Sequence, residues 1–156
     1  MVGRGGRILK AVVQRVDQAS VVVEGEVVGA IEKGFLIYLG CEVGDDSTVA
    51  QTMATRLSKL RIFEDADGKT NLDLAAAEGS ILLISQFTLA ADLRKGNRPS
   101  FTTALPPDQA RVLLGEVRNV LENKGFRVES GVFGAHMRVT STNVGPATYL
   151  LNLSGS

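Results

Sequence analysis

The chain has 156 residues, of which 44% are hydrophobic and 22% charged, a composition typical of one globular domain large enough to bury a core. Its seventeen basic residues are balanced by seventeen acidic ones, so it lacks the overall positive field that marks many nucleic-acid-binding proteins. The single cysteine, Cys41, excludes an internal disulfide framework and suits a reducing compartment.

No segment of the sequence suggests a membrane or a second domain. No apolar run approaches the roughly 20 residues that a membrane-spanning helix needs, so we expect no membrane partner. Residues 1–7 carry three glycines and lack the apolar core of a signal peptide, which predicts a flexible tail. We therefore expect one domain over 8–156 and a cytoplasmic protein.

Strand signals dominate the first part of the chain. Short runs rich in β-branched and other apolar residues, bounded by turn signals, are typical of strands. They predict strands over 10–16, 20–23, 27–31 and 35–41. Gly25 is placed in the turn of a β-hairpin. The unbroken apolar run of the fourth strand indicates burial on both faces.

Two helices are predicted among the remaining strands. Apolar residues at helical spacing indicate one helix over about 46–60 and a second from Pro106 to Lys124, which Gly125 ends. The other predicted strands cover 61–63, 80–87, 126–130, 136–142 and 147–153. The pattern indicates an α+β, strand-rich single domain with a mixed or antiparallel sheet and two main helices.

One predicted strand ends in polar residues. The apolar run over 81–84 leads into Ser85, Gln86, Phe87 and Thr88. Buried polar groups cost free energy unless they are paired, so these side chains either satisfy one another or are held ready for a ligand. Thr88 is a nucleophile, a hydrogen-bond donor or simply a strand residue. Phe87 and Phe101 are core residues by default, although an exposed phenylalanine can stack on a base.

Several common chemistries are excluded by what the chain lacks. The only histidine, His136, lies in a predicted strand and is interpreted as structural, so a Ser-His-Asp triad is not supported. Cys41, interpreted as a core residue, and one histidine do not make a zinc site. No glycine-rich phosphate loop is present. Chemistry must therefore use hydroxyls, backbone amides or a group on the substrate, with no metal and no cofactor.

Two loops complete the set of candidate sites. Gly145-Pro146 lies between two predicted strands, and it is either an ordinary turn or a rigid backbone probe aimed at a ligand. Arg94, Lys95 and Arg98 place three positive charges within five residues, close to the polar strand end. They are either a solvated loop or contacts for phosphate groups.

Several of these segments together resemble the D-aminoacyl-tRNA deacylase family, in the type found in bacteria and most eukaryotes. The matching segments, in family order, are Ala11–Val16, Gly25–Gly29, Arg61–Phe63, Ser85–Leu89, Arg98–Phe101 and Asn143–Thr148. They run from about residue 8 to residue 153, which is nearly the whole chain. Any one of them would be weak, but together they are specific.

The resemblance implies a homodimer of α+β subunits with the active sites at the interface. It implies hydrolysis of the ester that joins a D-amino acid, or glycine mischarged on tRNA-Ala, to the 3′-terminal adenosine of tRNA. The family's catalytic motif falls on Ser85, Gln86, Phe87 and Thr88. Its Gly-Pro motif falls on Gly145 and Pro146; in the family this peptide is typically cis and enters the partner's active site, where it refuses L-aminoacyl-tRNA. Arg15 matches the arginine that helps to hold the motif.

The sequence departs from the family pattern beside the Gly-Pro motif. Val144 and Ala147 stand where the family commonly has Asp and Val. A related branch carries its Gly-Pro in trans and is less strict about chirality, but that branch also differs at the Ser-Gln-Phe-Thr segment, which is intact here. Strict chiral selection is therefore the expectation, and a relaxed-chirality deacylase is the alternative.

We expect modest catalytic machinery, because an aminoacyl ester is already activated. Backbone N–H groups near Phe87 and Thr88 would stabilise the developing oxyanion. The missing general base leaves two alternatives for the attack: the 2′-hydroxyl of the terminal ribose orients water, which we favour, or Thr88 is the nucleophile. The rivals from other classes are a non-catalytic RNA- or protein-binding dimer and a small-molecule esterase.

Overall fold

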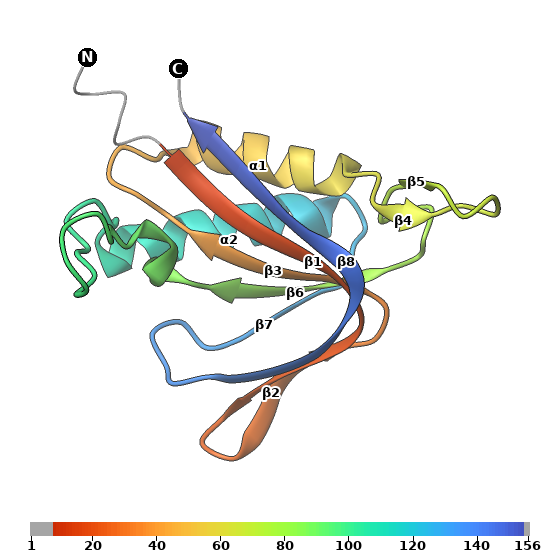
Figure 1. The fold of residues 1–156 in the computed structure, drawn as a ribbon, viewed down its shortest axis with the longest axis horizontal. Coiled ribbons are helices and arrows are strands. Elements are labelled where there is room, and N and C mark those ends of the chain that lie inside the picture. Colours follow the sequence, from red (N-terminus) through yellow and green to blue (C-terminus); the bar gives the residue numbers. More distant parts are fainter. Residues whose placement is uncertain (1–7, 155–156) are drawn as a thin grey trace.

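The computed structural model of the chain describes residues 8–154, so the tail predicted over 1–7 lies outside the described residues. The helices and strands follow one another in the order β1 (Ile8–Val23), β2 (Glu26–Ile31), β3 (Gly34–Gly40), α1 (Ser47–Lys59), β4 (Phe63–Glu64), β5 (Thr70–Leu72), β6 (Ser80–Ser85), α2 (Pro107–Asn123), β7 (Val128–Ser130) and β8 (Arg138–Ser154). The α+β class with two main helices is confirmed (Figure 1).

A mixed sheet forms the centre of the domain, as predicted. Its strands lie in the order β2-β1-β3-β6-β7, and β8 pairs with β1. β1 is antiparallel to β2, β3 and β8, whereas β6 is parallel to both β3 and β7. In Figure 1, β1 and β8 run side by side and bend together, and α1 and α2 lie on the same side of the sheet.

The middle strands are buried on both faces. On the helical face, Phe35, Ile37 and Leu39 of β3 share a core with buried residues of α1 and α2. On the opposite face, Leu36 of β3 joins Leu82 of β6 and side chains of the bent β1. This double burial explains the unbroken apolar runs of β3 and β6, because a polar side chain on either face would lose its water.

Both helices form where they were predicted. The Asp46 carboxylate caps α1 by accepting a hydrogen bond from the Val49 N–H at 3.1 Å. α2 carries Pro107 in its first turn and is followed by Gly125, whose φ of +95° is the left-handed conformation that favours glycine after a helix. Within residues 8–154, neither helix is long and apolar enough to cross a membrane.

The prediction was wrong about the two longest strands. The strands predicted over 10–16 and 20–23 are one strand, β1, and those predicted over 136–142 and 147–153 are one strand, β8. Asp17 and Gln18 interrupt the apolar pattern of β1, but they are exposed at a point where the β1–β8 register shifts. A strand bent at such an irregularity can carry polar residues outward without ending.

Candidate active site

The polar segment after β6 leaves the sheet rather than extending it. The strand predicted over 80–87 ends at Ser85, and Phe87–Ala90 forms a single 3₁₀ turn. Gln86 still joins the sheet, because its N–H donates to the Leu39 carbonyl of β3 at 2.8 Å. The turn therefore begins at the carboxyl end of a buried parallel strand pair, which fixes where its backbone starts.

Gly40 at the end of β3 allows the turn to pack closely. A Cβ at this position would lie 2.8 Å from the Gln86 carbonyl oxygen and 2.8 Å from the Leu89 Cβ, closer than real Cβ contacts. Only glycine fits without moving the backbone there. The sequence pattern did not indicate this role, because Gly40 simply ends an apolar run.

The turn presents backbone donors and a hydroxyl that no base activates. Within the described chain, no hydrogen-bond acceptor occupies the N–H groups of Phe87 and Thr88. The exposed Thr88 hydroxyl donates to the Gln86 Oε1 at 2.9 Å, which is a neutral amide oxygen. An amide does not withdraw the hydroxyl proton, so this contact positions Thr88 without making it a nucleophile.

An aromatic cavity opens beside the turn. It has a volume of about 400 Å³, and Ser85, Gln86 and Phe87 contribute to its wall. The expectation that Phe87 and Phe101 are core residues was wrong: Phe87 is 59% exposed, and the two rings pack against each other with centroids 5.1 Å apart. The loop before β8 adds Phe133 to the wall, so three aromatic rings line the cavity.

Cys41 forms part of the same wall and is buried, as predicted. Burial, and secondarily the negative charge of Asp45, raises the pKa of the Cys41 thiol to about 12. The thiol is therefore neutral near pH 7 and is not an activated nucleophile.

The Gly145–Pro146 segment is an excursion from the β1–β8 ladder. Gln14 pairs with Thr148 and Val16 pairs with Asn143, so four residues of β8 face the single residue Arg15. The Gly145–Pro146 peptide bond is cis, and both residues are exposed. This short segment therefore leaves the ladder within one strand, where the sequence predicted a break between two strands.

Arg15 fixes the base of this excursion. Its Nε and Nη2 donate to the Val144 carbonyl at 3.2 and 3.0 Å, and its Nη1 donates to the Ile62 carbonyl at 2.7 Å. The Asn143 side chain adds bonds from its Nδ2 to the carbonyls of Arg15 (3.0 Å) and Ala147 (3.2 Å). The family resemblance implied that Arg15 helps to hold this segment, and its role in the active site stays a prediction. Asn143 was missed, although it lies in a segment that carried the family resemblance.

One chain does not bring the two candidate regions together. Arg15 pairs with Phe35 at the start of β3, whereas Gln86 bonds to Leu39 near its end, a separation of roughly 13 Å along the strand. No residue of 143–148 lines the aromatic cavity. Figure 1 likewise places the bend of β8 at the opposite end of the sheet from the carboxyl end of β6.

The loop that carries Arg94, Lys95 and Arg98 contains one cation that is paired and two that are unpaired within the described residues. Asp92 and Ser100 exchange backbone hydrogen bonds of 2.7 and 2.9 Å, which closes the loop. Arg94 donates to both carboxylate oxygens of Asp92, at 2.9 and 2.8 Å, and these bonds hold the pKa of Asp92 below its usual range. Lys95 and Arg98 are exposed, and their side chains form no hydrogen bond or ion pair within residues 8–154.

His136 lies outside the aromatic cavity. The strand predicted over 136–142 begins two residues later, at Arg138, and His136 is exposed in the preceding loop. It lines a separate hollow of about 420 Å³ together with Glu24 and Arg138. Among the described residues, no group of three or more His, Cys, Asp or Glu side chains is placed to hold a metal ion.

The sequence matches known proteins over most of its length. A family model described as D-Tyr-tRNA(Tyr) deacylase matches residues 12–152. The chain is 48% identical to the D-aminoacyl-tRNA deacylase of Lactobacillus acidophilus, over 93% of the chain and 100% of that protein. It is 50% identical to the D-aminoacyl-tRNA deacylase of Anaeromyxobacter dehalogenans, over 92% of the chain and 97% of that protein.

Solved structures share the fold. The structure of a protein named "c-Myc DNA Unwinding Element Binding Protein" superposes with a TM-score of 0.85 at 38% identity, covering 91% of this chain and 97% of that one. A probable eukaryotic D-amino acid tRNA deacylase superposes with a TM-score of 0.83 at 16% identity, covering 94% and 100%, a likeness that shows the fold alone.

Fold and sequence together place the chain among the hydrolases that act on ester bonds. More closely, it belongs to the D-Tyr-tRNA(Tyr) deacylase family, whose model covers nearly its whole length. The resemblance drawn from the motifs is thereby confirmed.

Proposed function

We propose that this chain hydrolyses the ester bond of D-aminoacyl-tRNA and releases the free amino acid and tRNA. The carrying observation is that, within the described residues, no acceptor occupies the N–H groups of Phe87 and Thr88, in a turn whose first residue lines an aromatic cavity. Donors held in place before the reaction stabilise a developing oxyanion without reorganisation, and each contributes about 2.7–4 kcal/mol in other enzymes. The relatives named D-aminoacyl-tRNA deacylase support the choice of substrate.

The aromatic cavity suits a planar or apolar part of the substrate. The exposed ring of Phe87, braced by Phe101, offers the kind of surface on which the terminal adenine stacks. The ester would then lie over Ser85–Thr88, with its carbonyl oxygen toward the two N–H groups. Lys95 and Arg98 are the proposed phosphate contacts, because Arg94 already binds Asp92.

We propose that the 2′-hydroxyl of the terminal ribose orients the attacking water. The contact of the Thr88 hydroxyl with a neutral amide supports this, since neither group is a general base at neutral pH. The test is single-turnover deacylation by Thr88→Ala, and by the unaltered protein on tRNA ending in 2′-deoxyadenosine. We expect Thr88→Ala to retain most activity and the deoxy substrate to lose it. If the deoxy substrate is cleaved at the normal rate and Thr88→Ala is inactive, the proposal is wrong and Thr88 is the nucleophile.

We further propose that the protein acts as a homodimer in which Gly145 and Pro146 enter the partner's site. Their exposure and their distance from the cavity of their own chain support this arrangement. Backbone carbonyls there would occupy the space of an L-side chain while admitting D-residues and glycine. Steric exclusion suits this task, because a pocket that merely fits D-side chains gains only a few kcal/mol of discrimination.

Chirality is tested with three esters of tRNA. We expect D-Tyr-tRNA, and glycine mischarged on tRNA-Ala, to be cleaved rapidly, and L-Tyr-tRNA to remain intact over the same time. Comparable rates on D-Tyr and L-Tyr would support the relaxed-chirality deacylase, the alternative raised by Val144 and Ala147.

A cross-subunit site is tested by mixing inactive and unselective subunits. Gly40→Ala should disable the turn of its own chain, and Arg15→Met should release the Gly-Pro segment of its own chain. In dimers of the two, the intact turn meets the intact Gly-Pro segment of the other subunit. Excess Gly40→Ala should therefore restore D-selectivity to Arg15→Met. Unselective activity that persists at every mixing ratio would place both regions in one chain.

The second candidate is a nucleic-acid-binding dimer without turnover. The solved relative that is named for binding a DNA element favours it, as does the absence of a triad. Equilibrium binding of uncharged tRNA together with no deacylation of D-Tyr-tRNA would support this candidate against the deacylase.

A further inference from the structure

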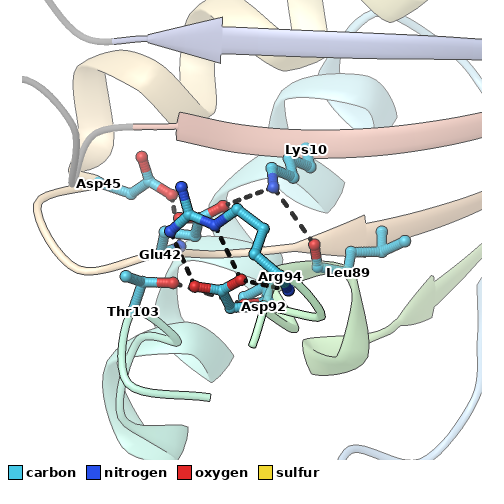
Figure 2. Close-up of polar contacts among 8 residues, drawn as sticks. Lys10, Glu42, Asp45, Leu89, Asp92, Arg94 and Thr103 are labelled. Carbon is cyan, nitrogen blue, oxygen red and sulfur yellow. Dashed lines mark hydrogen bonds and ion pairs between the residues drawn. The ribbon is translucent and has the colours of Figure 1, made fainter. Parts of the chain in front are cut away.

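Lys10, near the start of β1, reaches the turn that carries the two candidate oxyanion donors. Its Nζ donates to the Leu89 carbonyl at 3.4 Å and lies 3.1 Å from the Glu42 Oε2. Figure 2 shows the ammonium group between the Glu42 carboxylate and the Leu89 carbonyl. Leu89 belongs to the same four-residue turn as Phe87 and Thr88, so one side chain links the first strand to the candidate site.

Glu42 holds Lys10 in this position. Glu42 is 4% exposed, and within the described chain Lys10 is the cation that pairs with it. A buried carboxylate without a partner is strongly destabilising, so Lys10 cannot leave without cost. The ion pair with Glu42 and the hydrogen bond to Leu89 therefore fix the direction of the ammonium group together.

The segments around Glu42 converge on the same turn. Glu42 forms an antiparallel bridge with Ala104, and its N–H donates to the Asp45 Oδ2 at 2.7 Å. From the bridged segment, the Thr103 hydroxyl donates to the Ala90 carbonyl at 3.4 Å. The last two residues of the turn are thus each held by a side chain, Leu89 by Lys10 and Ala90 by Thr103.

We propose that Lys10 is a positioning residue for deacylation: it holds the Leu89 carbonyl, and Glu42 fixes its ammonium group. The inference rests on the proposed function. In a single 3₁₀ turn, a shift at Leu89 also moves the N–H groups of Phe87 and Thr88, and displacements near 1 Å can cost about 10²-fold in rate. Lys10 acts through the turn and does not touch the ester.

The test separates stability from catalysis with two variants. Lys10→Met leaves Glu42 buried and unpaired, so both thermal stability and kcat should fall. Lys10→Met/Glu42→Leu removes both charges, and its melting temperature should recover, because apolar residues often replace a buried ion pair without loss. The bond to Leu89 is still absent, so kcat on D-Tyr-tRNA should stay about tenfold low with KM within about twofold. This loss is smaller than the 10²–10³-fold that follows removal of a donor.

Recovery of kcat together with stability in the double variant would overturn the proposal, since the pair would then be structural only. Lys69→Met, at an exposed lysine between β4 and β5, is the matched control and should change neither quantity. A kcat for Lys69→Met as low as that of the double variant would also contradict the proposal.

Hydrogen exchange provides a readout that does not depend on the substrate. The N–H groups of Leu89 and Ala91 donate to the carbonyls of Gln86 and Thr88 within the turn. Their exchange should be about tenfold faster in the double variant, while exchange in β3 stays unchanged. Faster exchange in a protein without deacylase activity would refute the proposed function and leave the positioning role standing. Unchanged exchange at both amides would refute the positioning role.

Discussion

The turn after β6 and the Gly145–Pro146 excursion of β8 are built in opposite ways. The turn begins on buried parallel strands and packs against Gly40, its first residue Phe87 lines a cavity of the same chain, and within residues 8–154 no acceptor occupies the N–H groups of Phe87 and Thr88. The excursion contains four residues of β8 that face only Arg15 in the ladder, and side-chain hydrogen bonds from Arg15 and Asn143 hold it. The turn and the excursion are thus separate in one chain, and this separation is what motivates the proposed site shared by two chains.

The largest effect is expected from crowding the turn. Gly40→Ala places a Cβ 2.8 Å from the Gln86 carbonyl oxygen, which is backbone and cannot rotate away. We expect kcat on D-Tyr-tRNA to fall about 10²-fold and stability to fall by about 1–3 kcal/mol through overpacking. Urea unfolding and single-turnover kinetics measure the two.

Gly115→Ala is the matched control, because a Cβ at Gly115 in α2 meets nothing within 4 Å. It should keep full activity and gain about 0.5–1 kcal/mol of stability from improved helix propensity. Equal losses of activity in the two alanine variants would show that close packing at Gly40 does not shape the turn.

Releasing the excursion should change selectivity more than rate. Arg15→Met removes both donors to the Val144 carbonyl, and charge-assisted hydrogen bonds are each worth about 1.5–3 kcal/mol. We expect the ratio of D-Tyr to L-Tyr cleavage to fall by roughly tenfold or more while cleavage of D-Tyr-tRNA changes little. Rates on the two esters give the ratio directly.

Arg118→Met is the control for this prediction. Arg118 also bonds to a backbone carbonyl, that of Val128 at 2.9 Å, but it does so between α2 and β7. Its loss should lower stability and leave the D/L ratio unchanged. A D/L ratio that stays high in Arg15→Met would show that Arg15 does not contribute to chiral selection.

A smaller effect is expected at Lys95 and Arg98, the proposed phosphate contacts. Lys95→Ala/Arg98→Ala should weaken tRNA binding several-fold and reduce the slope of log K against log salt by about one for each phosphate that the variant no longer neutralises. Arg94→Ala should weaken binding less, because Asp92 already engages that guanidinium. Filter-binding titrations at several salt concentrations distinguish these outcomes. An Arg94→Ala effect as large as that of the double variant would show that the ion pair opens on tRNA.

Much of the fold was accessible from the sequence because it depends on local pattern. The double-sided burial of β3 and β6 produces unbroken apolar runs, and Gly125 marks the end of α2. The continuity of β1 and β8 was not accessible, because pairing across a bend depends on residues more than a hundred positions apart.

The site residues divide in the same way. Short motifs pointed to Ser85–Thr88 and Gly145–Pro146, but not to what surrounds them. The exposure of Phe87 arises because the chain turns out of the sheet, which the strand-like pattern Ser-Gln-Phe-Thr does not indicate. Lys10 and Glu42 carried no signal, since an ion pair between β1 and the segment that follows β3 exists only once the strands have paired.

The smallest effect is expected on stability at alkaline pH. It tests whether water is excluded from the cavity beside the turn, whereas the Gly145–Pro146 excursion is exposed to water. Burial raises the pKa of Cys41 from about 9 to about 12, so the folded state holds the thiol proton more tightly than the unfolded state does. This contribution to stability is complete below about pH 9 and is lost as the pH rises toward 12, by at most about 1.4 kcal/mol per pH unit.

The alkaline loss is isolated by comparison with Cys41→Ala in urea titrations at pH 8, 9.5 and 10.5. Tyr38, whose pKa burial also raises, is present in both proteins, so its contribution cancels in the difference. The free energy of unfolding should fall more steeply with pH in the unaltered protein than in Cys41→Ala. Parallel pH dependences would mean that water reaches the thiol through the cavity, and the cavity beside Phe87 and Thr88 would then lack the low polarity that strengthens their N–H groups as oxyanion donors.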